Sequence, residues 1–202
     1  MTDCCFVIGI SITFVATLCS ILALSLDYWE VGAIESEGVG PILLNYVHIQ
    51  AGLWYEHRTF HDFAKTDVPS GLGNTTKVWR EIDFSTETGM MLFATRLLLF
   101  IALFSLVAAC VCSTLTYTKY QNMKGLLNTA WALSIEAGIL LLICFVVYLT
   151  GIKENSTELH AAFYLDIVAW LLAWLSAIFL FLSSRTFLAL MTEDRDQPSE
   201  LI

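Results

Sequence analysis

Four stretches of the chain are almost entirely hydrophobic, and each is long enough to cross a lipid bilayer. They cover residues 6–26, 90–115, 126–150 and 161–190. At the rise of an α-helix the shortest of them spans about 31 Å, which matches the hydrocarbon core of a membrane. The pattern therefore predicts a mainly α-helical membrane protein with four transmembrane helices. Polar segments separate the spans, namely the loops 27–89 and 151–160 and a short tail, 191–202.

The long loop contains a different pattern, in which apolar and polar side chains alternate. The alternation runs from Tyr46 to Glu56 and predicts a half-buried β-strand. A shorter strand-like piece from Tyr28 to Ile34 carries Trp29 and is its expected partner. Residues 78–84 are a third candidate that fits the alternation only in part. We expect a small antiparallel sheet that rests on the helices.

The composition supports a membrane protein and excludes several other classes. Hydrophobic residues make up 57% of the 202 residues and charged residues only 14%, which is less charge than soluble domains usually carry. The net charge of −9 argues against nucleic acid as a partner. The six cysteines lie in or beside apolar runs, so neither a disulfide framework nor a zinc site is expected.

Two features predict which loops share a side of the membrane. The short loop between the second and third spans carries Lys119 and Lys124, and basic loops favour the cytoplasm. Glycosylation sequons begin at Asn74 and Asn155, in the other two loops. We therefore expect a multi-pass protein of the plasma membrane with both termini in the cytoplasm. The first span is expected to be retained, because it is too long for a signal peptide and no basic residue precedes it.

Two charged residues near the outer ends of their spans are expected to meet. Arg96 and Asp166 each lie about 8–9 Å below the outer boundary at the helical rise. Because a charge in lipid is unfavourable, each should face the bundle and find a partner. The favoured interpretation is an ion pair that fixes the packing of the helices, and the alternative is a part of an ion path.

Glu136 lies near the middle of the third span, with no basic residue at its depth. The favoured interpretation is a buried carboxylic acid that is hydrogen-bonded to the hydroxyl groups of Ser11, Thr13 or Thr17 in the first span. The alternative is a protonation switch or an ion ligand.

No residues in the loops form a recognisable catalytic or cofactor site. His57 and His61 have the spacing of a metal pair on a helix, but no third ligand is evident, and a solvated loop is the expected structure. The 27–89 loop holds ten acidic and four basic residues, a net charge of −6 that suits either simple solubility or basic partners. We expect no enzyme activity, no metal and no cofactor.

Both ends of the chain carry candidate interaction sites. Cys4 and Cys5 lie at the edge of the first span, where S-palmitoylation is one interpretation and inert thiols are the other. The last residues, Glu200 to Ile202, have the form of a ligand for a PDZ groove.

One set of residues resembles a known family. Trp29, the run Gly52-Leu53-Trp54 and Arg96 early in the second span are together similar to the motif of the claudin superfamily, which includes claudins, peripheral myelin and epithelial membrane proteins, and calcium-channel gamma subunits. The resemblance covers the layout of the whole chain. It implies a single domain, 1–202, that folds as a left-handed four-helix bundle capped by an extracellular sheet.

The chain departs from that family at one position. His57 stands where the family usually has the first cysteine of a disulfide, and the 27–89 loop has no cysteine. The sheet must then be held by packing, through Trp29, Leu53, Trp54 and Tyr55.

The resemblance implies two functions of different classes. The first is a structural protein of cell–cell contacts that associates laterally and across cells. The alternative is an auxiliary subunit of a channel or receptor. The run Phe145 to Tyr148 at the end of the third span is similar to the gamma-subunit group of the family. The expected partners are membrane lipids and either the protein itself or another membrane protein.

Overall fold

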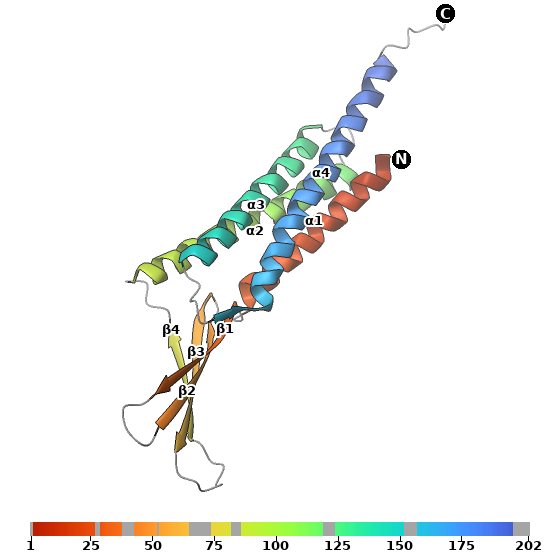
Figure 1. Cartoon of the computed structure of the whole chain (residues 1–202). Coiled ribbons are helices and arrows are strands. Elements are labelled where there is room, and N and C mark those ends of the chain that lie inside the picture. The colour runs from red at the N-terminus through yellow and green to blue at the C-terminus, as the bar shows by residue number, and fades with distance from the viewer. Residues whose placement is uncertain are drawn as a thin grey trace, which may run out of the picture. The chain divides into compact units, whose positions relative to one another are not determined.

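Figure 1 shows the computed structural model of the chain. It describes the backbone over residues 2–26, 29–37, 43–51, 53–64, 74–81, 86–118, 124–151 and 157–195. Side chains are described for most of the helical residues and for a few residues of the sheet.

Long helices form where the sequence is hydrophobic. They are α1 (Thr2–Ser25), α2 (Glu87–Thr118), α3 (Lys124–Gly151) and α4 (Ala161–Arg195). Within the described residues, these four are long and apolar enough to cross a membrane. The predicted spans are confirmed, although all four helices extend past the predicted bounds at one or both ends, and α1 ends one residue before its predicted end. The protein is therefore a multi-pass membrane protein of mainly α-helical structure.

Many of the buried positions of the helices carry small residues, and many of the exposed positions carry large apolar ones. In α4 the buried positions include Ala169, Ala173 and Ser176, spaced by four and then three residues, whereas Leu171 and Ile178 are exposed. Small residues let neighbouring helices approach closely, and a repeat of four and three is the spacing of left-handed helix packing. Large side chains on the exposed faces are what a helix bundle presents to lipid.

The chain forms two compact units. The bundle unit consists of residues 1–21, 98–143 and 167–202, and its described part is helical. The sheet unit consists of residues 22–97 and 144–166, and it holds all the described strands together with one end of each helix. Because every helix contributes residues to both units, neither unit is a separate stretch of the chain.

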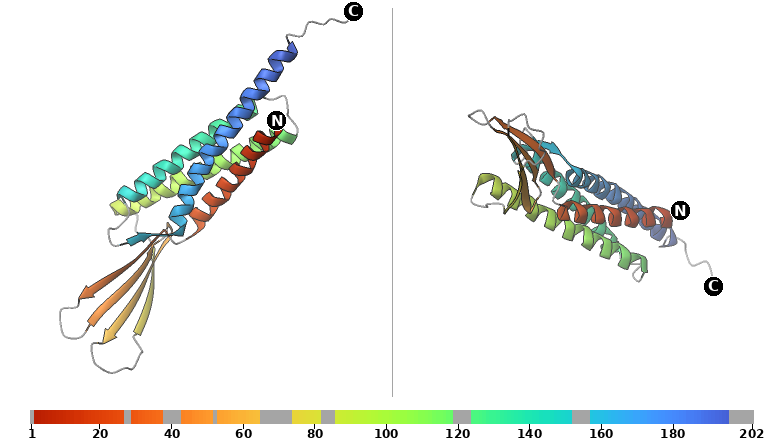
Figure 2. Two further views of the ribbon diagram at one scale, coloured as in Figure 1. Left: turned by 45° about the vertical axis from the view of Figure 1, so that its right-hand side comes forward. Right: turned by 90° about the horizontal axis from the view of Figure 1, so that it is seen from below.

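The sheet unit contains five described strands, which Figure 2 shows side by side. Their order is β4-β3-β2-β1-β5, and every neighbouring pair is antiparallel. The strands are β1 (Glu30–Glu37), β2 (Leu43–Ala51), β3 (Tyr55–Ala64), β4 (Asn74–Glu81) and β5 (Thr157–Leu159).

The pairing of the strands confirms two predictions. β1, which follows Trp29, pairs with β2 as expected, with Gly32 opposite Ile49. β5 comes from the second loop and adds to the free edge of β1, with Glu30 opposite Leu159. The segments between α1 and α2 and between α3 and α4 therefore contribute to one sheet. This agrees with the prediction that the two loops share one side of the membrane.

The predicted strand from Tyr46 to Glu56 is wrong at its end. β2 stops at Ala51 and a new strand begins at Tyr55, so that Leu53 and Trp54 form a turn. If β2 continued past Ala51, Leu53 and Trp54 could not form this turn. Both residues bind helices through the turn, as described below. The alternation of apolar and polar residues from Tyr46 to Glu56 therefore comes from two strands and not from one.

β3 and β5 were not predicted, and β4 begins four residues before the candidate segment 78–84 and overlaps it over residues 78–81. His57 and His61 fall in β3 and not in a solvated loop. Four residues along a strand span about 13 Å, so the helical spacing that suggested a metal pair does not apply to them.

Candidate functional site

Trp29 joins the start of the sheet to the end of α1. Its side chain is fully buried, and its indole Nε1 donates a hydrogen bond to the Ala23 carbonyl at 2.9 Å. Ala23 is among the last four residues of α1, whose carbonyl groups have no partner inside the helix. Trp29 also accepts a hydrogen bond at its own carbonyl from the His160 backbone N–H, at 2.9 Å. One residue therefore contacts the end of α1 and the segment that leads into α4.

The turn between β2 and β3 is fixed to two helices. The indole Nε1 of Trp54 donates to the Leu24 carbonyl at 2.8 Å, which satisfies a second carbonyl at the end of α1. Arg96 of α2 donates to the carbonyl of the fully buried Leu53. The guanidinium carbon of Arg96 also lies 4.7 Å from the centre of the Trp54 ring, within the range of a cation–π contact.

We call Trp29, Leu53, Trp54 and Arg96 the tryptophan–arginine cluster. These are four of the five residues on which the resemblance to claudins depends, and the structure brings them together in the sheet unit. The fifth, Gly52, lies outside the described residues. The expectation that packing alone holds the sheet is therefore incomplete, because directed hydrogen bonds contribute as well.

An aromatic group packs around Trp29. Its ring centre lies 4.8 Å from that of Tyr148 and 6.1 Å from that of Phe163, and Phe145 stacks on Phe163 at 5.2 Å. The Tyr148 side chain is buried, and so is that of Glu30 at the start of β1. Sequence reasoning singled out Phe145 and Tyr148 only for their likeness to a family. Their spacing of three residues, which places both on one side of α3, could have indicated a packing role.

Asp166 and Arg96 do not form the predicted ion pair. Asp166 is fully buried, and neither of its carboxylate oxygens has a hydrogen-bond partner among the described residues. Arg96 instead reaches the Leu53 carbonyl and the Trp54 ring. Matching depth predicted the pair, but depth says nothing about which way a long side chain turns around its helix.

Glu136 is not buried, which corrects the second prediction for the membrane charges. Its side chain is exposed and makes no hydrogen bond with the described residues. The hydroxyl groups expected to bind it are occupied elsewhere: Thr13 donates to the Gly9 carbonyl and Thr17 to the Thr13 carbonyl, each at 2.8 Å, and Ser11 donates to the Val7 carbonyl. A hydroxyl in a helix readily finds the carbonyl one turn earlier, so none of the three needs Glu136.

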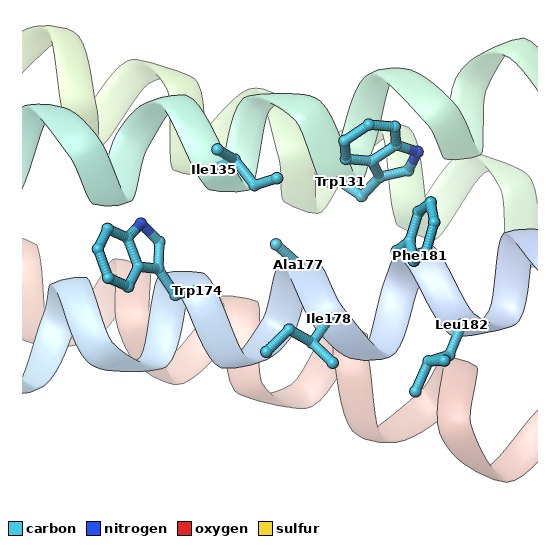
Figure 3. A pocket seen from close by; sticks show the side chains of 7 residues that line it. All are labelled: Trp131, Ile135, Trp174, Ala177, Ile178, Phe181 and Leu182. Carbon is cyan, nitrogen blue, oxygen red and sulfur yellow. The ribbon is translucent and has the colours of Figure 1, made fainter.

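An apolar groove of about 480 Å³ runs between α3 and α4 in the bundle unit (Figure 3). Trp131 and Phe181 lie together at one end, in an edge-to-face contact at 5.4 Å, and Trp174 lies at the other end. The lining residues are aliphatic or aromatic, so the groove fits hydrocarbon. They are Trp131, Ile135, Trp174, Ala177, Ile178, Phe181 and Leu182.

Polar groups gather near the Trp131 end of this groove. Asn128 accepts hydrogen bonds from the Trp131 indole at 3.2 Å and from the Ser184 hydroxyl at 2.8 Å. Arg185 lies with its guanidinium carbon 5.2 Å from the centre of the Phe181 ring. An apolar interior with polar groups at one end is typical of a position at the membrane–water boundary.

The remaining candidate sites stay predictions. The six cysteines, all within the described residues, are free; Cys4 is exposed and Cys5 half-buried. Asn74 is the first residue of β4. Asn155 and the segment 200–202 lie outside the described residues.

Together these features define an integral membrane protein in which hydrophobic helices carry a small antiparallel sheet. No protein-family model matches the chain, and a search of the curated proteins found no match. The likeness to claudins therefore depends on the residues of the tryptophan–arginine cluster and on the layout of the chain.

Proposed function

We propose that this chain is a non-enzymatic, claudin-like protein of the plasma membrane that organises cell–cell contacts through lateral and trans interactions. In this proposal both termini lie in the cytoplasm and the sheet lies outside the cell. The observation that carries the proposal is the tryptophan–arginine cluster, which joins the sheet to the end of α1 and to α2.

The cluster suits a protein whose sheet is a contact surface. Two indole N–H groups join β1 and the β2–β3 turn to the end of α1, and one guanidinium joins the turn to α2, so force on the sheet passes directly to the helices. A sheet joined only by flexible linkers would transmit no such force. The geometry supports adhesion more than it supports a freely moving sensor.

The edges of the sheet offer backbone groups to a partner. β5 pairs with only the first three residues of β1, Glu30 to Gly32. Residues 33–37 of β1 pair with β2 on one side, and on the other side no described strand lies beside them; the outer edge of β4 likewise has no described neighbour. Exposed strand edges pair readily with another chain, which is one route to a trans contact.

The test is to express a fluorescent fusion of the full chain in cells that form monolayers. We expect enrichment at borders where both neighbours express the protein, and none where only one does. Arg96→Met, compared at equal surface delivery with Val168→Leu on the exposed face of α4, should lose the enrichment. Uniform distribution of the wild-type chain at such borders would overturn the proposal.

The proposed topology has its own test. A cysteine placed beside Asn74 should react with a membrane-impermeant reagent in intact cells, whereas one placed beside Lys119 should react only after permeabilisation. Labelling of both positions in intact cells would contradict the orientation.

An auxiliary subunit of a channel or receptor is the alternative, in which the exposed Glu136 on α3 would bind a transmembrane partner of a different kind. Affinity purification in a mild detergent separates the two functions. A channel or receptor recovered in stoichiometric amount would replace the contact function with the auxiliary one.

A further inference from the structure

Glu136 lies at a depth where water is absent. It is twelve residues past the start of α3, about 18 Å along a helix that crosses a hydrocarbon core of about 30 Å. Its side chain is exposed on the bundle and makes no hydrogen bond or ion pair with the described residues. An acidic side chain is therefore directed toward lipid near the middle of the membrane.

Lipid tails cannot satisfy this group in either protonation state. An ionised carboxylate in hydrocarbon lacks solvation, and the neutral acid still has a donor and acceptors without partners. Ionisable residues within spans normally face a bundle interior or a water-filled cavity and pair with another polar group. The described part of this chain offers Glu136 none, so we look for its partner on another molecule.

The other exposed hydroxyl groups of the spans do not share this property. Five exposed serine and threonine hydroxyl groups donate to the carbonyl four residues earlier in their own helix, so these five need no partner from outside. This holds for Ser11, Thr114, Thr129, Thr150 and Thr186. Glu136 differs because it makes no hydrogen bond with a described group of its own helix.

The surface around Glu136 has the form of a helix-packing seam. Its exposed residues are spaced alternately by four and three, which is the repeat with which two helices pack along a common stripe. Small residues precede Glu136 and β-branched residues follow it, and small residues allow close approach of helices in membranes. We call this set the α3 stripe: Gly125, Thr129, Ala132, Glu136, Ile139 and Ile143.

We propose that two copies of this chain pair in the membrane through the α3 stripe, with Glu136 of one copy hydrogen-bonded to Glu136 of the other. All copies share one orientation in the membrane, so a two-fold axis along the membrane normal places both carboxyl groups at the same depth. The two groups satisfy one another when at least one carries its proton. The stripe is self-complementary, because each small half faces the same small half. This inference rests on the proposed function, for which it supplies the lateral partner.

The test counts subunits of the purified full chain in lipid vesicles by single-molecule photobleaching, at a fixed and low protein-to-lipid ratio. Wild type and Glu136→Gln, which keeps a donor and an acceptor, should be dimers. Glu136→Leu should weaken the association by about tenfold or more, given the strength of polar contacts between membrane helices. Val168→Leu, on the exposed face of α4, is the matched control and should behave as wild type.

A second variant keeps Glu136 and alters the surface beside it. Ala132→Trp should separate the helices and lower the dimer fraction as strongly as Glu136→Leu does. Dimers of unchanged stability in either variant would overturn the pairing, as would a monomeric wild type that recovers a different membrane protein through Glu136. A dimer that forms as described by a chain that never gathers at cell borders would overturn the proposed function alone.

Discussion

The two units of the protein differ in how their buried polar groups are hydrogen-bonded. In the sheet unit the indoles of Trp29 and Trp54 and the guanidinium of Arg96 bind carbonyl groups on other elements. In the bundle unit most buried hydroxyls bind their own helix, as Ser113 does to Ala109 and Ser134 to Ala130, and Ser184, which donates to Asn128 of α3, is an exception. In the sheet unit, hydrogen bonds thus join the sheet to the helices. In the bundle unit, the described contacts between helices are mostly van der Waals packing.

This difference sets what a substitution should do in each unit. A directed bond depends on one donor, so its removal leaves a buried acceptor without a partner. Packing by shape is shared among many contacts, so a single change is absorbed unless it creates overlap. We therefore expect the largest losses of stability in the tryptophan–arginine cluster and smaller ones in the bundle unit.

The strongest challenge to this comparison is Trp29→Ala. It removes a fully buried indole, its hydrogen bond to Ala23 and its contacts with Tyr148 and Phe163. We expect the free energy of unfolding to fall by about 3–5 kcal/mol, the usual range for a buried aromatic residue. Unfolding in mixed detergent micelles measures it.

Trp174→Ala is the control for Trp29→Ala, because Trp174 lies at the exposed groove and is 36% accessible. Its loss should be clearly the smaller of the two. Equal losses at the two tryptophans would remove the distinction between the units.

Arg96→Met tests the directed bond between α2 and the β2–β3 turn. Methionine keeps an apolar stem but cannot donate to the Leu53 carbonyl or lie as a cation over Trp54. We expect a loss of about 1.5–3 kcal/mol, as for a hydrogen bond to a charged group. Limited proteolysis of the 27–89 segment in detergent should also become faster.

Arg96→Lys sharpens the same test. Lysine keeps the charge but lacks the planar guanidinium that lies over Trp54, so its loss should be intermediate. If the sheet of Arg96→Met were as resistant to protease as that of the wild type, the bond from Arg96 to the Leu53 carbonyl would not hold the sheet in place.

Gly138→Ala tests packing by shape in the bundle unit. A Cβ at this position would lie within 2.2 Å of Cδ1 of Trp174, so the indole has to move. Strain of about 1–3 kcal/mol is expected, partly offset by about 1 kcal/mol of better helix propensity. The matched change Gly9→Ala meets only the flexible end of Leu180, at 3.0 Å, and should leave stability unchanged or slightly raised. Thermal unfolding followed by tryptophan fluorescence compares the two, and equal shifts would mean that Trp174 is not tightly seated.

The sequence predicted the bundle better than the sheet for a physical reason. A span in lipid needs about twenty apolar residues whatever its neighbours are, so α1 to α4 can be read from hydrophobicity alone. A strand needs a partner, and the end of β2 at Ala51 depends on Leu53 and Trp54 binding helices distant in sequence. Short β5 exists only because β1 offers it an edge.

The candidate site was predicted as a set of residues but not as a set of contacts. The motif pointed to Trp29, Leu53, Trp54 and Arg96, which do meet. Glu136 was placed inside the bundle because a lone acid avoids lipid, yet the register of α3 turns it outward. Register and side-chain direction follow from tertiary packing, which hydrophobicity along the chain does not record.

The smallest expected effect is that of Asp166→Asn, and it separates two accounts of the sheet unit. An ion pair with Arg96 would make the change severe, because breaking a buried pair usually costs about 3–5 kcal/mol. The structure gives Asp166 no hydrogen-bond partner among the described residues, so an amide of the same shape should alter stability by less than about 1 kcal/mol. A double-mutant cycle with Arg96→Met should return a coupling energy below about 0.5 kcal/mol. A coupling of several kcal/mol would instead mean that Arg96 divides its bonds between Leu53 and Asp166, and that the directed bonds of the sheet unit extend into α4.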